Sequence, residues 1–322
     1  MENVRPGKVA VIGSGNMGAS IAELLASNGK EVLLVDLNIE LLENAQKRIR
    51  SVAERQEKFL SSRSAKEIQR IESLGITLTA DQKKSLESKL NEGKEGNFAD
   101  RVMKHIHPVT SYQEIAGSSF VFEAIFEKME VKKDLFKVLS KILDKDTIVA
   151  SNTSSLSISE FSNAFEYPEQ VIISHFFNPP YTLPLVEVVP GIKTSSDTVD
   201  RTIKFISGLK NHRTSMKPVL VRESPGFVVN RILVPMINEA ISLYGEGVAS
   251  KEDIDLAMKL GAGMPMGPLE LADMVGLDVL LDVAKVFEQD FGDQKYRAPY
   301  NLKRMVWGGY LGRKSGKGIY DY

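Results

Sequence analysis

The sequence predicts an α/β protein in which a doubly wound parallel sheet, in residues 1–222, is followed by an all-α domain in residues 223–322. In residues 8–36, the apolar run KVAVI, a glycine-rich turn, a helical segment and the run EVLLVD form a βαβ pattern. Later runs are also continuously apolar, as expected of strands that helices cover on both faces. Strand patterns stop after Ser224-Pro225-Gly226, and only helical patterns follow. A length of 322 residues suits two domains.

The remaining elements follow from the same patterns. Short apolar runs predict further strands at residues 118–125, 147–152, 170–177, 183–191 and 219–224. Helical spacing predicts the C-terminal helices at residues 227–247, 250–261 and 267–291. Ser250 and Asp253 form a capping signal at the start of the second of these helices.

A charged helical arm is expected at about residues 39–104. The pattern predicts a long helix, a loop near SLGITLTADQ and a second helix, for which Thr79 and Gln82 supply a capping box. The arm is too polar to belong to the core. Two interpretations remain open, namely a solvated hairpin and a flap over a charged cofactor or substrate tail.

The composition excludes several classes of function. A net charge of −1 gives no electrostatic basis for binding nucleic acid or an anionic membrane. The absence of cysteine removes disulfides, thiolate chemistry and cysteine-bound metals. No signal-peptide pattern and no apolar run of about 20 residues occurs, so we expect a cytoplasmic protein. His105, His107 and His212 have no carboxylate cluster beside them in the sequence, which predicts no metal site.

The glycine-rich turn reads Gly13-Ser14-Gly15-Asn16-Met17-Gly18. In a Rossmann-like unit, the first glycine permits the tight turn and the second lets a pyrophosphate approach the backbone. The third lets helix and strand pack closely, while the helix N-terminus binds the phosphates. Asp36, at the end of the second strand, is placed to bind the adenosine ribose. The alternative is an ordinary βαβ turn with an exposed aspartate.

Asp36 also predicts which nicotinamide cofactor binds. A 2′-phosphate about 4 Å from this carboxylate is repelled by roughly 4 kcal/mol at an effective dielectric constant of about 20. No arginine follows directly in DLNIELL to compensate for that repulsion. The sequence therefore predicts NAD rather than NADP.

His175 ends a buried strand in VIISHFFN, and Glu187 lies in the next strand. A turn and a returning strand bring such residues together, and a carboxylate on one imidazole nitrogen leaves the other to accept a proton. The carboxyl ends of the strands are also where ligands bind in open α/β sheets. The alternative is a buried histidine that is satisfied by hydrogen bonds.

Small polar residues, Ser151-Asn152-Thr153-Ser154-Ser155, follow another predicted strand. Their hydroxyl and amide groups suit the orientation of a substrate oxygen. They equally suit a helix N-terminus, with Ser155 as the cap before LSISEF.

The combined motifs resemble those of the L-3-hydroxyacyl-CoA dehydrogenases, and most closely those of the bacterial 3-hydroxybutyryl-CoA dehydrogenases. The stretches that carry the resemblance include VAVIGSGNMGASIA, FEAIFEKMEVKKDLF, ASNTSSLSI, SHFFNPP, SPGFVVNRIL and GYLGRKSGKGIYDY. They occur in order over nearly the whole chain outside the charged arm.

The resemblance implies NAD-dependent, reversible oxidation of an (S)-3-hydroxyacyl-CoA to the 3-ketoacyl-CoA at a site between the two domains. It implies that His175 is the general base, that Glu187 orients it, and that Ser154 and Asn230 hold the substrate oxygens. It places four further residues near the cofactor, namely Glu123, Lys128, Asn178 and Lys314. It also implies a homodimer formed through the C-terminal domain.

Two stretches depart from the family pattern. Pro179-Pro180-Tyr181-Thr182-Leu183-Pro184 is similar to the dehydrogenases of small hydroxy acids such as gulonate or carnitine, which gives an alternative function. The arm at residues 39–104 is longer than usual, with Ser51 and Lys58 near the positions that the family uses to contact CoA. Basic residues in KRIRSVAERQEK suit the CoA phosphates or a solvated helix face.

Overall fold

The computed structural model describes residues 8–91 and 97–322 and divides into two compact units. The first unit runs to Thr153 and then from Ile158 to Val221. The second, helical unit consists of Ser154–Ser157 and Arg222–Tyr322. The sequence placed a boundary near residue 223 but gave no sign that the short segment Ser154–Ser157 belongs with the C-terminal residues.

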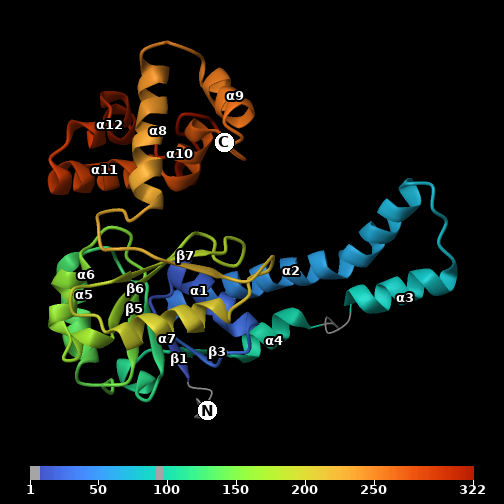
Figure 1. The fold of residues 1–322 in the computed structure, drawn as a ribbon, viewed down its shortest axis with the longest axis horizontal. Coiled ribbons are helices and arrows are strands. Elements are labelled where there is room, and N and C mark those ends of the chain that lie inside the picture. Colours follow the sequence, from blue (N-terminus) through green and yellow to red (C-terminus); the bar gives the residue numbers. More distant parts are fainter. Residues whose placement is uncertain (1–7, 92–96) are drawn as a thin grey trace. The chain divides into compact units, whose positions relative to one another are not determined.

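The first unit is built on one eight-stranded sheet (Figure 1). Its strand order is β3-β2-β1-β4-β5-β6-β7-β8, and every neighbouring pair is parallel except β6 and β7, which are antiparallel. The strands are β1 Val9–Ile12, β2 Val32–Val35, β3 Ile106–Val109, β4 Phe120–Glu123, β5 Ile148–Ser151, β6 Val171–Phe176, β7 Leu185–Pro190 and β8 Lys217–Leu220. The predicted doubly wound sheet is confirmed.

Helices cover both faces of this sheet, which explains why the central strands are apolar on both sides. Val9 and Val11 of β1 pack in the same cluster as Ile21 of α1 and Ile206 of α7. The other face carries α5 and α6, where Phe136 packs edge-on against Phe161. The helices of this unit are α1 Asn16–Ser27, α2 Ile39–Ser73, α3 Ala80–Asn91, α4 Phe98–Lys104, α5 Met129–Leu139, α6 Ile158–Phe161 and α7 Ser196–Ser207.

Two details of the sheet differ from the sequence prediction. Strand β3 was missed, because its residues Ile106–Val109 include an exposed histidine and a proline, and this disguises a strand at the sheet edge. Strand β8 runs from Lys217 to Leu220 rather than over the predicted residues 219–224. Lys217 and Pro218, which lie outside the apolar run, pair with β7, whereas the polar residues 222–224 do not.

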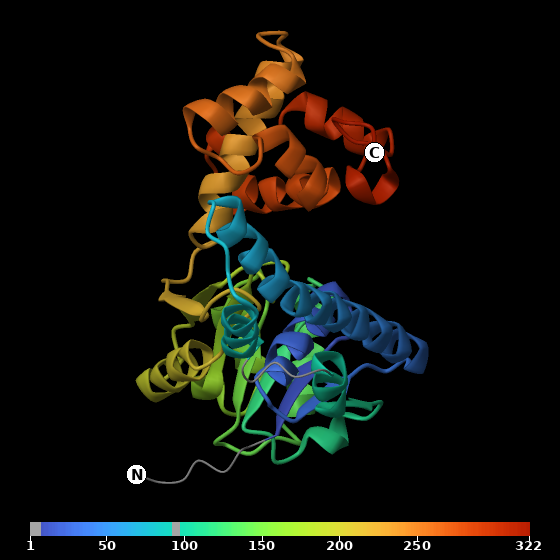
Figure 2. The same cartoon turned by 90° about the vertical axis from the view of Figure 1, so that its right-hand side faces the viewer.

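The charged arm is a helical hairpin that leaves the sheet (Figures 1 and 2). Helix α2 has 35 residues, and its first turns pack into the core through Leu42, Ala45 and Ile49. The capping box at the start of α3 is confirmed: Thr79 N–H donates to Gln82 Oε1 at 2.9 Å, and Gln82 N–H donates to Thr79 Oγ1 at 3.3 Å. Residues 92–96, also within the expected arm, lie outside the described residues.

The helical unit contains α8 Val229–Gly245, α9 Lys251–Gly261, α10 Pro268–Val275, α11 Leu277–Phe291 and α12 Tyr300–Trp307. The capping signal at α9 is confirmed, since Asp253 N–H donates to Ser250 Oγ at 3.1 Å. The run predicted as one helix at 267–291 is two helices, α10 and α11. Gly276 separates them with a φ of 106°, a value that glycine adopts without strain.

Short 3₁₀ turns connect these elements. They lie at Tyr112–Ile115, Ser162–Ala164, Pro168–Gln170, Gln294–Tyr296 and Arg313–Ser315. None of the helices in the described residues 8–91 and 97–322 is long and apolar enough to cross a membrane.

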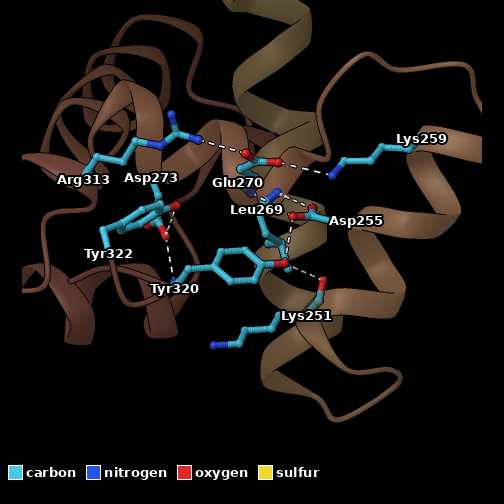
Figure 3. Close-up of polar contacts among 9 residues, drawn as sticks. All are labelled: Lys251, Asp255, Lys259, Leu269, Glu270, Asp273, Arg313, Tyr320 and Tyr322. Atoms are coloured by element: carbon cyan, nitrogen blue, oxygen red, sulfur yellow. Dashed lines mark hydrogen bonds and ion pairs between the residues drawn. The ribbon is translucent and has the colours of Figure 1, made fainter. Parts of the chain in front are cut away.

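Two buried aspartates anchor the C-terminal tail (Figure 3). Asp273, which is 1% exposed, accepts the N–H groups of Ile319 and Tyr320, each at 2.8 Å. Asp255 accepts the phenolic O–H of Tyr320 at 2.9 Å. Burial, followed by the effects of the Asp255 carboxylate, raises the pKa of Tyr320 well above its ordinary value. The tail is thus an integral part of this unit.

Candidate active site

The glycine-rich turn between β1 and α1 leaves no room for side chains at its first and last glycines. Gly13 has a φ of +97°, and a Cβ on it would lie 2.5 Å from the carbonyl oxygen of Ala124. A Cβ on Gly18 would lie 1.7 Å from the carbonyl oxygen of Gly13. Both positions therefore require glycine for the close contact of turn, helix and neighbouring strand.

The middle glycine has a different environment. A Cβ on Gly15 would meet no heavy atom within 4 Å. Gly15 is also the N-cap of α1, and no side chain caps the helix there. Open space beside uncapped N–H groups at a helix N-terminus fits the pyrophosphate of a dinucleotide. Asn16 is exposed and Met17 half-buried on the first turn of α1.

Asp36 follows β2 and contacts the glycine-rich turn. Its Oδ2 accepts the backbone N–H of Ser14 at 2.9 Å and the Ser14 hydroxyl at 2.8 Å. Its Oδ1 accepts the N–H of Asn38 at 3.4 Å. Burial, and then the charge of Asp36, raises the pKa of Tyr112. The carboxylate is thus held at the end of β2, at the same edge of the sheet as the turn.

Arg48, on α2, ties the arm to the turn in a way that the sequence did not reveal. Its guanidinium donates to Asn16 Oδ1 at 2.6 Å and to the carbonyl oxygen of Ser14 at 2.8 Å. Arg48 also lines a cavity of about 270 Å³ in the first unit. The same cavity is lined by Asn16 and Asn178, which the sequence placed near the cofactor, and by Arg55.

His175 and Glu187 face each other across the antiparallel pair β6 and β7. His175 Nδ1 lies 2.9 Å from Glu187 Oε2, and the two side chains are 9% and 1% exposed. A carboxylate on Nδ1 holds the hydrogen on that nitrogen, so Nε2 is the nitrogen with the basic lone pair. The contact that the sequence predicted across the returning strand is present.

The end of β6 is fixed by groups from the neighbouring strands. Asn152 Oδ1 accepts the N–H of Phe176, the residue after His175, at 2.9 Å. Asn152 N–H in turn donates to the carbonyl oxygen of Glu123 at 2.8 Å. The ring of Phe177 lies 4.6 Å from the imidazole of His175, between ring centroids. Helix α6 begins at Ile158, so Ser155 does not immediately precede it.

Glu123, at the end of β4, is buried in a charged network. Its oxygens accept from Lys132 Nζ at 2.6 and 2.8 Å, and also from the Ile125 N–H and the Ser151 hydroxyl. The lysine that contacts Glu123 is Lys132. Lys128, which the sequence placed near the cofactor, is exposed at the N-cap of α5. The spacing of four residues between these lysines gave no signal of which one turns inward.

Two of the predicted site residues, Asn230 and Lys314, belong to the helical unit. The first lies at the start of α8 and the second in the C-terminal tail. Asn230 is the second residue of α8, whose start is held by Arg231 donating to Tyr296 Oη at 3.2 Å and to Ser224 Oγ at 2.9 Å. Lys314 pairs with the Asp278 carboxylate at 2.6 Å.

Ser154 is half-buried in the short segment that groups with the helical unit. Ser157, in the same segment, donates to Glu223 Oε1 at 2.6 Å. The first unit contains the predicted residues Gly13–Gly18, Asp36, Glu123, Lys128, His175, Asn178 and Glu187. Ser154, Asn230 and Lys314 belong to the helical unit.

The other three histidines each contact a glutamate that is distant in sequence. His105 Nδ1 and His107 Nε2 lie 2.7 and 2.6 Å from the two oxygens of Glu31. His212 Nε2 lies 2.8 Å from Glu23 Oε1. No group of three or more such side chains within residues 8–91 and 97–322 is arranged to hold a metal ion.

Comparison with known proteins matches both units to one family. The model of the 3-hydroxyacyl-CoA dehydrogenase NAD binding domain matches residues 8–84 and 75–223. The model of the 3-hydroxyacyl-CoA dehydrogenase C-terminal domain matches residues 226–322. Together they extend over nearly the whole chain, including the glycine-rich turn, Asp36 and the His175–Glu187 pair.

Individual relatives agree with this match. A 3-hydroxybutyryl-CoA dehydrogenase of Clostridioides difficile is 41% identical over 317 residues, which cover 98% of this chain and 99% of the relative. The human mitochondrial hydroxyacyl-coenzyme A dehydrogenase is 38% identical, with 98% and 90% covered. The crystal structure of (S)-3-hydroxybutyryl-CoA dehydrogenase from Ralstonia eutropha has a TM-score of 0.80 at 36% identity, with 98% of each chain covered. This chain belongs to the 3-hydroxyacyl-CoA dehydrogenase family.

Proposed function

We propose that this protein catalyses the reversible NAD-dependent oxidation of a short-chain (S)-3-hydroxyacyl-CoA, such as 3-hydroxybutyryl-CoA, to the 3-ketoacyl-CoA. Family membership supports the reaction class, and relatives named 3-hydroxybutyryl-CoA dehydrogenase support the short chain. The observation that carries the proposal is the buried contact of 2.9 Å between His175 Nδ1 and Glu187 Oε2 at the carboxyl end of β6.

His175 is the general base in this reaction. Its Nε2 takes the proton of the substrate 3-hydroxyl, and Glu187 holds the hydrogen on Nδ1 and stabilises the imidazolium that forms. Bound NAD supplies the acceptor for the hydride that leaves C3. In the reverse direction, the imidazolium returns its proton to the oxygen of the 3-keto group. Burial of the pair strengthens the interaction between its charges by keeping water away.

Substrate oxygens need hydrogen-bond donors as charge shifts onto the carbonyl groups. We assign this role to the Ser154 hydroxyl and the Asn230 amide. Glu123, Lys128, Asn178 and Lys314 are assigned to the cofactor, together with Gly13–Gly18 and Asp36.

The arm gives the CoA part of the substrate a binding surface. Arg48 and Arg55, about two turns apart along α2 at 3.6 residues per turn, both line the cavity beside the glycine-rich turn. Guanidinium groups bind phosphates with paired, charge-assisted hydrogen bonds. Ser51 lines the same cavity and accepts a hydrogen bond from Arg55 at 3.2 Å. Lys58 is not among the residues that line it.

The test is NADH consumption with acetoacetyl-CoA, compared with free acetoacetate and 3-dehydrocarnitine. Rapid turnover of the thioester alone is the expected result. Turnover of a free acid alone would contradict the proposal and would assign the protein to the small hydroxy acid dehydrogenases that the segment Pro179–Pro184 resembles. NADH binding without turnover of any of the three would leave only a cofactor-binding role.

A homodimer through the helical unit and a cytoplasmic location complete the proposal. Large apolar side chains exposed on the helical unit support the dimer, among them Ile232, Leu260 and Trp307, which are 68%, 79% and 69% exposed. Light scattering should give twice the mass of 35.7 kDa. The absence of cysteine fits a reducing compartment.

A further inference from the structure

The first unit contains a second buried imidazole–carboxylate pair, which the proposed reaction does not use. His212 Nε2 lies 2.8 Å from Glu23 Oε1, and the side chains are 9% and 1% exposed. These exposures equal those of His175 and Glu187. Glu23 lies on α1, the helix that begins at the glycine-rich turn, and His212 lies 189 residues later, in the connection before β8.

Tyr181 joins this pair to the segment that departs from the family pattern. The N–H of His212 donates to the carbonyl oxygen of Tyr181 at 2.9 Å, and the two rings lie 5.4 Å apart between centroids. Phe98 packs edge-on against the imidazole at 5.9 Å. The Asn211 amide donates to the carbonyl oxygen of Pro180 at 3.4 Å. The segment Pro179–Pro184, which departs from the family pattern, is therefore held in place by contacts with His212 and its neighbour Asn211.

One oxygen of Glu23 lacks a partner. Oε1 contacts His212, whereas Oε2 is buried and has no hydrogen-bond partner among the residues that the structure describes. A carboxylate oxygen that is shielded from water and left unpaired is costly, so native structures usually supply a donor. Glu23 and Tyr181 both line the cavity of about 270 Å³, so a ligand in this cavity is a source of the donor.

The two sides of the cavity differ in the groups that they offer. Helix α2 contributes the guanidinium groups of Arg48 and Arg55, which donate hydrogen bonds, whereas α1 contributes the carboxylate of Glu23, which accepts them. A ligand that fits both sides carries anionic oxygens and also N–H or O–H groups. Coenzyme A has this combination, since its pantetheine arm holds two amide N–H groups and a hydroxyl between the phosphates and the thioester.

We propose that Glu23 is a specificity-determining residue that accepts a hydrogen bond from an amide N–H or the hydroxyl of the pantetheine arm through Oε2. His212 and Tyr181 position Glu23 against the cavity. This inference rests on the proposed function, since it names the part of an acyl-CoA that the residue recognises. A free hydroxy acid has no such arm and gains nothing from this acceptor.

The test compares Glu23→Gln with the wild type on two thioesters. Acetoacetyl-CoA carries the pantetheine arm, whereas S-ethyl acetoacetothioate carries the reacting groups without any N–H or O–H donor. Glu23→Gln keeps the shape of the side chain and an oxygen for His212 but replaces the second acceptor with an NH₂ donor. Glu43→Gln is the matched control, because Glu43 is exposed on α2 and does not line the cavity.

The expected result is a KM for acetoacetyl-CoA about tenfold or more above that of the wild type, as for the loss of a hydrogen bond to a charged group. The kcat should change by less than about twofold, because the contact is remote from the reacting atoms. The kcat/KM for S-ethyl acetoacetothioate and the KM for NADH should stay unchanged. Glu43→Gln should match the wild type in all four values.

An equal loss of kcat/KM on both thioesters would overturn the inference, because it would show a general structural role. An unchanged KM for acetoacetyl-CoA, or an altered KM for NADH, would overturn it as well. If Glu23→Gln does not fold, Glu23→Asp takes its place in the test. This variant retains the charge but withdraws the acceptor by one methylene, so it should also raise the KM for acetoacetyl-CoA. If the wild type itself does not turn over acetoacetyl-CoA, it is the proposed function that fails.

Discussion

The ammonium group of Lys132 lies 2.6 Å from Glu123 in the first unit, and the two side chains are 1% and 0% exposed. A buried charge that loses its partner is left uncompensated. We therefore expect Lys132→Met to lower the free energy of unfolding by about 3–5 kcal/mol. Chemical denaturation measures this loss.

The control is Lys137→Met on the same helix, because Lys137 forms an exposed pair with Asp134. This substitution should lower the free energy of unfolding by less than about 1 kcal/mol. The double variant Lys132→Met/Glu123→Gln removes both charges and should recover part of the stability. If Lys132→Met has the same free energy of unfolding as the wild type, the Lys132–Glu123 pair makes no net contribution to stability.

His175→Gln should lower kcat by about a hundredfold to ten-thousandfold, since it removes the proposed base. NADH binding, followed by fluorescence, should remain. Glu187→Gln keeps an acceptor beside Nδ1 but removes the charge that stabilises the imidazolium, so a smaller loss is expected. Turnover near the wild-type value in His175→Gln would exclude this histidine as the base.

Asp36→Asn tests the choice of cofactor. The amide retains an oxygen for the two hydrogen bonds from Ser14 but no longer repels a 2′-phosphate. The wild type should prefer NADH over NADPH in kcat/KM, and the preference should fall by about tenfold or more in the variant. Equal use of both cofactors by the wild type would contradict the prediction.

Glu31→Gln tests a dependence on pH. Hydrogen bonds from His107, and then from His105, lower the pKa of Glu31. A carboxyl whose pKa is lowered by folding stabilises the protein above its unfolded-state pKa, and this contribution disappears as the pH falls through the folded-state value.

The Glu31→Gln variant should accordingly be less stable than the wild type at about pH 6, and the difference should shrink toward about pH 3. Because Glu31 is 50% exposed, the effect should be under about 1 kcal/mol. Urea titrations over this pH range measure the difference in free energy of unfolding between the variant and the wild type. If this difference grows as the pH falls, the predicted pH dependence has the wrong sign.

Gly318→Ala should destabilise the helical unit. A Cβ at Gly318 would lie 2.0 Å from Asp273 Oδ1, the atom that accepts the N–H of Ile319. We expect a loss of about 1–3 kcal/mol, typical of overpacking. Gly261→Ala is the control, because its Cβ meets no heavy atom within 4 Å, and it should change stability by less than about 0.5 kcal/mol.

Local patterns predicted most of the fold. The βαβ unit, the capping box of α3, the capping signal of α9 and the order of sheet and helices are all present, because each depends on residues that are close in sequence. Strand β3 and the division between α10 and α11 were missed. The first is held by pairing with β2 at the sheet edge, and the second depends on the backbone of a single glycine.

The candidate site was predictable where a strand pair fixes the geometry. His175 and Glu187 are 12 residues apart, and one returning strand decides that they meet. Glu23 and His212 are 189 residues apart and meet only through the tertiary fold. The contacts of Arg48 and Lys132 likewise depend on which face of a helix lies against the rest of the unit. A charged sequence with helical spacing does not determine that face.

The antiparallel register of β6 and β7 has a consequence for how this enzyme diversifies. Five consecutive residue pairs, from Ile172 opposite Pro190 to Phe176 opposite Val186, hold the register within the two strands, so side chains exchanged in the connection 177–184 leave His175 opposite Glu187. One residue inserted inside β7 before Glu187 would instead turn the carboxylate to the other face of the sheet. Tyr181 lies in this connection and lines the cavity. Side chains that line the cavity can therefore change in this connection while the His175–Glu187 contact stays in place.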